Sequence, residues 1–408
     1  MNMNMKVRLS ALMFLEFFIW GAWFVTMATY LFDGLGFEGA SVGAAYSTTA
    51  WAAIIAPFFV GMIADKFFNA EKVLFVTHLL GAGVMWYASS VTDPTTFFWV
   101  LLAYAVCYMP TIALVNTVAF SQMENVEKEF PGIRVWGTIG WIVAGLFITF
   151  LLNGMVEGNV EATAIPMKMA AAASLILAIY SCTLPKTAPP KSGEQVTISD
   201  ILGLDALKLM KNRSFAIFVI SSLLICIPLS FYYALANPFL NSFEWGNVAA
   251  KMSLGQASEV LFMLVIPFFF ARLGVKKMLL IGMLAWVGRY LLFAFGGTEM
   301  MGLTLYGGIL LHGICYDFFF VTGMIYVDNK APKEIRASAQ GFIAMVTYGI
   351  GMVIGSNIAG QVSAKYTSES GAVDWQSIWL IPGAMAFVVV IGFALLFKEK
   401  ESESVSSE

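Results

Sequence analysis

Charged residues are scarce in this chain. Of its 408 residues only 12% are charged, whereas 59% are apolar. A soluble domain carries about 25% charged residues and roughly 45–50% apolar ones. A soluble fold of this composition would have too few polar side chains to cover its core, and a net charge of −3 gives no electrostatic signature for nucleic acid. The composition excludes a cytoplasmic enzyme, a nucleic-acid-binding protein and a disordered protein, and it predicts a protein that crosses a membrane many times.

Histidine and cysteine are also scarce, with two and four residues. The cysteines lie in apolar runs without a Cys-x-x-Cys pair, which favours buried thiols over disulfides or metal ligands. The chain has no Gly-x-Ser-x-Gly, no P-loop and no His-Glu-x-x-His. We therefore expect no enzymatic activity, no metal and no cofactor. Because there is no ATP-binding motif, any transport would be driven by an ion gradient or would follow the concentration gradient of the solute. The cysteines are Cys107, Cys182, Cys226 and Cys315.

Long apolar runs dominate what is present. They are far too long for barrel strands, so only helices satisfy the backbone in lipid. The first run is also too long for a signal peptide and reads as an uncleaved span. The sequence thus predicts an all-α membrane protein with twelve transmembrane helices. The expected spans are 9–32, 41–63, 73–91, 97–121, 133–152, 162–184, 213–237, 248–271, 278–296, 301–327, 338–363 and 376–397.

The basic residues indicate the orientation. If the N-terminus lies in the cytoplasm, 19 of the 23 lysines and arginines fall in cytoplasmic segments. Positive charge gathers on the cytoplasmic side of membrane proteins. Lys168, Lys251 and Lys365 remain on the outer side, and Arg289 lies within a span. We expect both termini in the cytoplasm.

A long polar break divides the spans six and six, and the halves repeat each other. Pro57-Phe58-Phe59 precedes a basic turn, as Pro267-Phe268-Phe269 does in the second half. This layout is similar to that of major-facilitator carriers, which are built from parallel repeats. The turn from Gly61 to Lys66 also resembles the loop between spans two and three of that superfamily. We expect an N-terminal six-helix bundle over 1–184, a cytoplasmic linker over 185–212, a C-terminal bundle over 213–397 and a cytoplasmic tail over 398–408.

Four ionisable residues fall inside the expected spans: Glu16, Glu259, Arg289 and Asp317. Each costs about 2.5–3.5 kcal/mol at the centre of a membrane helix, so such groups usually face a partner or a watery cavity. Gln256 shares a helical face with Glu259, and this pair suits a ligand with hydroxyls and ring amides. A structural hydrogen bond between helices is the alternative.

Asp317 follows Tyr316 directly, and Tyr316 shares a face with His312, four residues earlier. This group predicts either a proton relay or substrate contact, or an ion pair between Asp317 and Arg289.

Glu16 shares a face with Trp20 on the first span, where it is a candidate for proton coupling or a carboxyl satisfied by a neighbouring helix.

On the fifth span, the spacing i, i+4 and i+7 places Arg134, Thr138 and Trp141 on one stripe of the helix surface. This stripe offers a fork-shaped donor, a hydroxyl and a ring. The alternative for Arg134 is a cytoplasmic anchor.

On the seventh span, Ser230, Tyr232 and Tyr233 come just before Asn237-Pro238. The proline is expected to kink this helix.

At these residues the chain resembles the bacterial nucleoside:proton symporters of the major facilitator superfamily, over roughly residues 6–398. The matching stretches include Trp20-Gly21-Ala22-Trp23, Tyr108-Met109-Pro110-Thr111, Ile133-Arg134-Val135-Trp136-Gly137-Thr138, Ser258-Glu259, Tyr316-Asp317-Phe318-Phe319 and Ile335-Arg336-Ala337-Ser338.

The resemblance implies a nucleoside site in a central cavity between the halves. The family's arginine and threonine on the fifth span and its glutamine and glutamate on the eighth match Arg134, Thr138, Gln256 and Glu259. Its ring positions match Trp141 and Tyr316, and its candidate for proton coupling matches Asp317. The chain departs from the better-known members at Glu16, Ser230, Tyr233 and His312, which leaves the base preference open.

We therefore hypothesise that the protein imports nucleosides by proton symport through alternating access. The expected substrate contacts are Arg134, Thr138, Trp141, Ser230, Tyr233, Gln256, Glu259, His312 and Tyr316, and the expected proton-coupling residues are Glu259, Asp317 and Glu16. A carrier for another polar solute (a sugar, nucleobase or modified nucleoside) and a non-transporting membrane protein are the alternatives. The expected partners are a nucleoside, a proton and the lipid bilayer, with the protein as a monomer.

Overall fold

The computed structural model describes residues 3–56, 68–188, 204–332 and 335–398. This part of the chain is almost entirely helical, and its only strand-like pairing is an isolated bridge between Thr367 and Val373. The Gly61–Lys66 turn, the Pro57-Phe58-Phe59 repeat and much of the expected linker and tail lie outside the described residues. The all-helical prediction is confirmed for the part described.

The N-half, residues 3–188, contains six long helical segments that coincide with the six predicted spans. The second of them reaches residue 56, where the described residues stop. The segments are α1 (Met3–Trp23) with α2 (Met27–Thr29) and η1 (Tyr30–Gly34); α3 (Gly39–Ala56); α5 (Ala70–Ala88); α6 (Pro94–Tyr108) with α7 (Thr111–Phe120); α9 (Pro131–Phe147) with η3 (Ile148–Leu152); and α10 (Ile165–Ser181).

The C-half, residues 204–398, repeats this plan. Its segments are α12 (Arg213–Asn241); α13 (Val248–Ala294); α14 (Leu303–Tyr316) with η8 (Asp317–Val321) and α15 (Thr322–Lys330); α16 (Arg336–Ala344) with η10 (Met345–Gly351) and α17 (Met352–Lys365); and α18 (Trp375–Leu396). Across both halves, eight described helical segments are long and apolar enough to cross a membrane, and α10 is a shorter apolar helix.

Helix α13 carries two of the predicted spans. At Gly274 the backbone is not helical, with φ 66° and ψ 177°, a conformation that glycine adopts at little cost. The two ends of α13 lie at the same end of the molecule, because Trp245, before the helix, packs on Tyr306 of α14 with ring centroids 4.6 Å apart. The helix is thus a hairpin, and its arms correspond to the expected spans 248–271 and 278–296.

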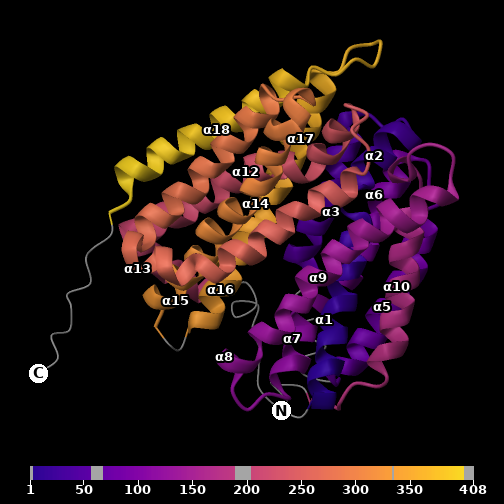
Figure 1. The fold of residues 1–408 in the computed structure, drawn as a ribbon. Helices are drawn as coiled ribbons and strands as arrows, with labels where there is room; N and C mark the ends of the chain where they lie inside the picture. The colour runs from indigo at the N-terminus through magenta and orange to yellow at the C-terminus, as the bar shows by residue number, and fades with distance from the viewer. Residues whose placement is uncertain (1–2, 57–67, 189–203, 333–334, 399–408) are drawn as a thin grey trace, which may run out of the picture.

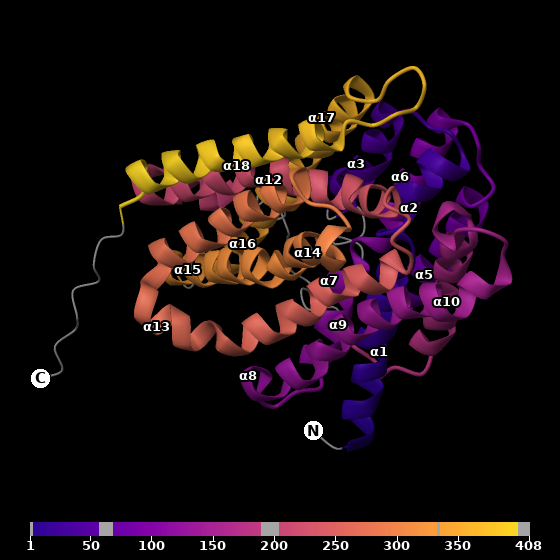
Figure 2. The ribbon, with the colours of Figure 1, turned by 45° about the horizontal axis from the view of Figure 1, so that its top comes forward.

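The two halves meet at one end of the bundle, opposite Met3, which we call the far end. In Figure 1 the halves come together near α2 and α17 at the top, and their helices diverge toward the bottom, where the N-terminus lies. Figure 2 gives the same arrangement, with α13 and α18 pointing away from α1. Gly43 of α3 packs so closely on α17 that a Cβ there would lie 2.4 Å from the Ser356 carbonyl oxygen.

Large apolar side chains cover the outside of the helices. Leu264 is 75% exposed, Phe150 69% and Trp99 62%. A soluble protein rarely exposes so much apolar surface in continuous patches, and in a bilayer these side chains face lipid. The membrane location thus follows from the surface as well as from the composition.

Candidate substrate cavity and buried charges

A cavity lies between the halves, bordered by α1 and α9 on one side and by α12 and α13 on the other. Of the predicted site residues, Trp141, Tyr233 and Gln256 line it. The ring of Trp141 lies 5.5 Å from that of Trp20, and the ring of Tyr233 lies 5.6 Å from that of Phe24. The full lining is Gly21, Phe24, Val25, Trp141, Gly145, Ile148, Tyr232, Tyr233, Ala249, Met252, Ser253 and Gln256.

Three other predicted residues form one group beside this cavity. His312 Nε2 lies 3.8 Å from Glu259 Oε2. The imidazole stacks on Tyr316 with ring centroids 5.9 Å apart and on the cavity residue Tyr232 at 5.6 Å. The Tyr316 hydroxyl is 2.9 Å from that of Tyr348 on η10. The group joins a carboxyl, an imidazole and two phenols, which can exchange hydrogen bonds with a polar ligand.

Arg134 and Thr138 lie on α9, as does Trp141. The Arg134 guanidinium lies 4.2 Å from the centroid of the Phe17 ring, a cation–π contact, and Thr138 is buried. The predicted stripe therefore exists on one helix. Of its three members, Trp141 is the one that lines the cavity described above.

Ser230 lies away from the cavity. It is fully buried, and its hydroxyl donates to the Cys226 carbonyl oxygen at 3.0 Å and to Met352 Sδ at 3.3 Å. These contacts place the side chain between α12 and α17. Its neighbour on the expected seventh-span face, Tyr233, is the one that reaches the cavity.

The ion pair considered between Asp317 and Arg289 is absent. Both side chains are fully buried, and none of their side-chain oxygens or nitrogens has a hydrogen-bond partner. The guanidinium lies instead 4.1 Å from the centroid of the Tyr232 ring on α12. This interaction with the ring face partly replaces the missing counter-ion, so that alternative from the sequence is wrong.

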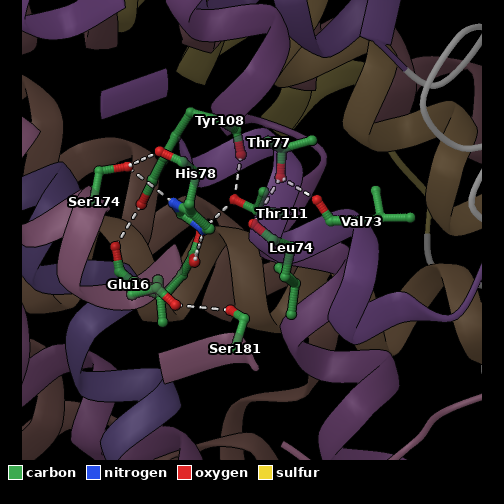
Figure 3. Close-up of polar contacts among 10 residues, drawn as sticks. Glu16, Val73, Leu74, Thr77, His78, Tyr108, Thr111, Ser174 and Ser181 are labelled. Atoms are coloured by element: carbon green, nitrogen blue, oxygen red, sulfur yellow. Dashed lines mark hydrogen bonds and ion pairs between the residues drawn. The ribbon is translucent and has the colours of Figure 1, made fainter. Parts of the chain in front are cut away.

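Glu16 lies inside the N-half, in the group of polar contacts that Figure 3 shows. Its Oε2 lies 3.0 Å from His78 Nε2 on α5, and its Oε1 accepts from the Thr111 hydroxyl at 2.6 Å. His78 Nδ1 in turn lies 3.1 Å from the Ser174 hydroxyl on α10. A fully buried carboxyl with two such partners matches the structural alternative that the sequence left open for Glu16.

Several polar residues here have no sequence signal that would single them out. His78 lies 62 residues from Glu16 and at no ligand spacing. Tyr348 lies in a glycine-rich run that reads only as a packing surface. Glu161 lies on the connection between two long helices but is 3% exposed, and a buried carboxyl on such a connection cannot be recognised from composition. No three potential metal-ligand side chains come together among the described residues.

Comparison with known proteins identifies the family. The sequence model described as "Nucleoside H+ symporter" matches residues 3–402. The chain belongs to the nucleoside H+ symporter family. It is similar to the putative nucleoside transporter YegT of Escherichia coli, with 41% identity over 98% of this chain and 96% of the relative. It is also similar to the xanthosine permease of E. coli, with 38% identity over 97% and 96%.

The fold agrees with this membership in the nucleoside H+ symporter family. A crystal structure of the nucleoside transporter NupG superposes with a TM-score of 0.87 at 36% identity, covering 98% of this chain and 100% of the other. The protein has the major facilitator fold and is a membrane transporter, not an enzyme. The predicted family and fold class are therefore confirmed.

Proposed function

We propose that this protein imports nucleosides together with protons across the bacterial inner membrane by alternating access. The observation that carries the proposal is the match to the nucleoside H+ symporter family over residues 3–402. The cavity between the halves supports it, since transporters of this type bind substrate at the interface between repeats. The two termini face the cytoplasm in this proposal, and the protein acts as a monomer with six spans in each half.

The cavity residues divide into ring surfaces and polar contacts. Trp141, Tyr233 and Tyr316 offer rings on which a base can stack. Gln256 and His312 offer donors and acceptors beside them. Arg134 and Thr138 take part from α9, where the neighbouring Trp141 lines the cavity. We assign no substrate contact to Ser230, because its hydroxyl is used between α12 and α17.

Glu259 and Asp317 are the proton-coupling residues of this proposal. The Glu259 side chain is 14% exposed beside His312, and Asp317 is fully buried without a partner. Burying an ionised carboxylate is costly, and protonation removes that cost. Each carboxyl is therefore expected to take up or release a proton when the cavity opens to the other side of the membrane.

The test is the uptake of labelled uridine and adenosine into vesicles with and without a proton gradient. The Glu259→Gln variant should lose gradient-driven accumulation and keep nucleoside exchange, because the amide cannot release a proton. Glu369→Gln, an exposed carboxyl of the α17–α18 loop, is the matched control and should accumulate normally. Normal accumulation by Glu259→Gln would refute the coupling role, and the absence of any nucleoside uptake by the wild type would refute the function.

In this proposal the rings of Trp141, Tyr233 and Tyr316, together with His312, determine which substrate is preferred. A competition panel tests the substrate preference. Unlabelled nucleosides, nucleobases and sugars are added in excess, and the loss of labelled uptake is measured. We expect nucleosides to compete best. Stronger competition by a sugar or a free base would favour the alternative of a carrier for another polar solute.

A further inference from the structure

A buried carboxylate connects the two halves at the far end. Glu161 lies in η5 (Val160–Ala162), on the connection that leads from η3 to α10 in the N-half. Its Oε2 accepts from Asn237 Nδ2 at 2.8 Å and from Asn241 Nδ2 at 3.0 Å, both on α12 of the C-half. Its Oε1 accepts from the backbone N–H of Ala249 at 2.9 Å. One side chain of the N-half thus binds three donors of the C-half.

Further polar contacts surround this carboxylate and also join the halves. The Thr29 hydroxyl donates to Asn237 Oδ1, and Asn159 Nδ2 donates to Asn241 Oδ1 at 2.9 Å. The backbone N–H of Ala250 donates to the Thr149 hydroxyl at 3.1 Å. Separating the halves at this end would break all of these bonds together.

The position of Glu161 explains why a carboxylate suits this place. Ala249 lies in the first turn of α13, where backbone N–H groups have no partner within the helix and the helix dipole favours negative charge. The residue that precedes α13, Asn247, makes no side-chain cap. The N-terminus of this C-half helix is therefore capped by a residue of the N-half.

This cluster lies directly against the cavity. Ala249 and Met252 line the cavity, Ala249 donates to Glu161, and Met252 Sδ lies 3.6 Å from Asn237 Nδ2. The cluster therefore separates the cavity from the far end of the molecule.

We propose that Glu161, with Asn237 and Asn241, is the far-end gate of the transport cycle. The carboxylate holds the far end closed in the state described, and its release exposes the cavity at that end. The proposal rests on the proposed function in one respect, that the protein works by alternating access. It adds a positioning residue that neither binds substrate nor carries the transported proton.

The test measures access to the cavity from the far end. The reporter is Ser253→Cys, a small change at a cavity-lining position of α13, in a background whose four native cysteines are replaced by serine or alanine. A membrane-impermeant maleimide is added to intact cells and, separately, to inverted vesicles. Glu161→Gln keeps the size of the side chain but has a single acceptor oxygen, so its amide N–H₂ group must face either the asparagine donors or the Ala249 N–H. Glu157→Gln, an exposed carboxyl on the same connection, is the matched control.

Losing hydrogen bonds to a charged group shifts a two-state equilibrium by roughly tenfold or more. We therefore expect Glu161→Gln to raise the labelling rate from the far side by about tenfold and Glu157→Gln to leave it unchanged. Asn241→Ala, which removes one donor and keeps the carboxylate, should give a smaller rise. This second variant keeps the proposal testable if Glu161→Gln fails to fold.

The labelling needs no nucleoside, so its outcome is separate from that of the proposed function. A rise in labelling would support the gate even if the protein transported no nucleoside. Unchanged labelling in folded Glu161→Gln and Asn241→Ala would overturn the gate and leave the proposed function standing.

Discussion

The buried carboxyl groups of this protein differ in their hydrogen-bond partners, and this difference distinguishes structural from functional roles. Glu16 and Asp317 are both fully buried. Glu16 has hydrogen-bonding partners on two neighbouring helices, His78 and Thr111, whereas both oxygens of Asp317 have none. A buried carboxyl with hydrogen-bond partners stabilises the bundle. A buried carboxyl without partners destabilises it, which indicates that the residue serves a purpose other than stability. The structure thus favours Asp317 over Glu16 as a coupling residue.

The Glu16→Ala substitution should destabilise the protein without uncoupling it. It leaves His78 Nε2 unpaired inside the N-half, and an unpaired buried group costs about 1–3 kcal/mol. The Thr111 hydroxyl loses one of its two acceptors and keeps the Tyr108 carbonyl oxygen. Glu16→Gln, which keeps an acceptor for Thr111, should lose less. Thermal unfolding in detergent measures the stability, and proton-driven nucleoside uptake per folded molecule should stay near the wild-type value. Loss of that uptake in a fully stable Glu16→Gln would instead assign Glu16 to proton coupling.

The sequence could identify these residues but not their partners. The cost of a charge in a membrane helix pointed to Glu16, Glu259, Arg289 and Asp317. It could not pair Glu16 with His78 or place Arg289 over Tyr232, because such contacts depend on how helices far apart in the chain rotate toward each other. The same limit explains why Ser230, chosen for its alignment with the family, faces α17.

At the scale of single helices, the first residues of α6 and α18 are fixed by side chains that can be recognised in the sequence. Asp93 caps α6 by accepting from the Thr96 N–H at 2.7 Å, with Pro94 in the first turn. Asp374 caps α18 by accepting from the Ser377 N–H at 3.1 Å. These are the residue types preferred before a helix. Local chemistry thus predicts where these two spans begin.

The cap of α18 should give the protein a pH-dependent increment of stability. Hydrogen bonds from the Ser377 side chain and backbone lower the pKa of Asp374 below its usual value. A carboxyl whose folded pKa is lowered stabilises the fold above its unfolded pKa and loses that contribution as the pH falls through the folded pKa. Asp374→Ala should therefore lower the melting temperature at pH 7 and have little effect under strongly acidic conditions.

Asp374→Asn is the control for this cap, since asparagine caps a helix without titrating. Its melting temperature should stay close to that of the wild type at pH 7. An equal loss of stability in Asp374→Ala at neutral and at strongly acidic pH would contradict the cap as the source of the pH dependence.

The interiors of the helices were less predictable than their ends. Residues 317–321 and 345–351 are π-helical. The first segment begins with Asp317, and the second contains Tyr348, whose hydroxyl lies 2.9 Å from that of Tyr316. Single π-helical turns often occur at functional sites. Apolar periodicity does not show them, because an extra residue in one turn arises from packing against other helices.

Across the whole molecule, contacts between the halves are concentrated at the far end. There Gly43 of α3 approaches Gly360 of α17, and a Cβ on Gly43 would lie 2.8 Å from the Gly360 Cα. Charge and the repeat predict a six-plus-six plan and an orientation with both termini in the cytoplasm. The end at which the halves close could not be predicted, because Glu161 and its partners in the C-half are 76 to 88 residues apart.

The Gly43→Ala substitution should push the halves apart at the far end. The added methyl group would overlap the Ser356 carbonyl oxygen, and two helix backbones must shift to make room for it. The far-side labelling of Ser253→Cys should rise, as it does for the gate variants. Gly83→Ala on α5 is the control, since nothing lies within 4 Å of its added Cβ. No rise in labelling for a folded Gly43→Ala would show that this contact does not limit opening.

The hairpin of α13 has an electrical consequence. Glu259 precedes Gly274 by 15 residues, and Arg289 follows it by 15. At about 1.5 Å per helical residue, both charges lie about 22 Å from the turn, at a common depth in the bilayer. They therefore experience the same fraction of the membrane voltage. A rigid movement of this hairpin carries no net charge from the pair while Glu259 is ionised, and one positive charge once Glu259 is protonated. Each charge moved across 100 mV is worth about 2.3 kcal/mol, so protonation would make the movement sensitive to voltage.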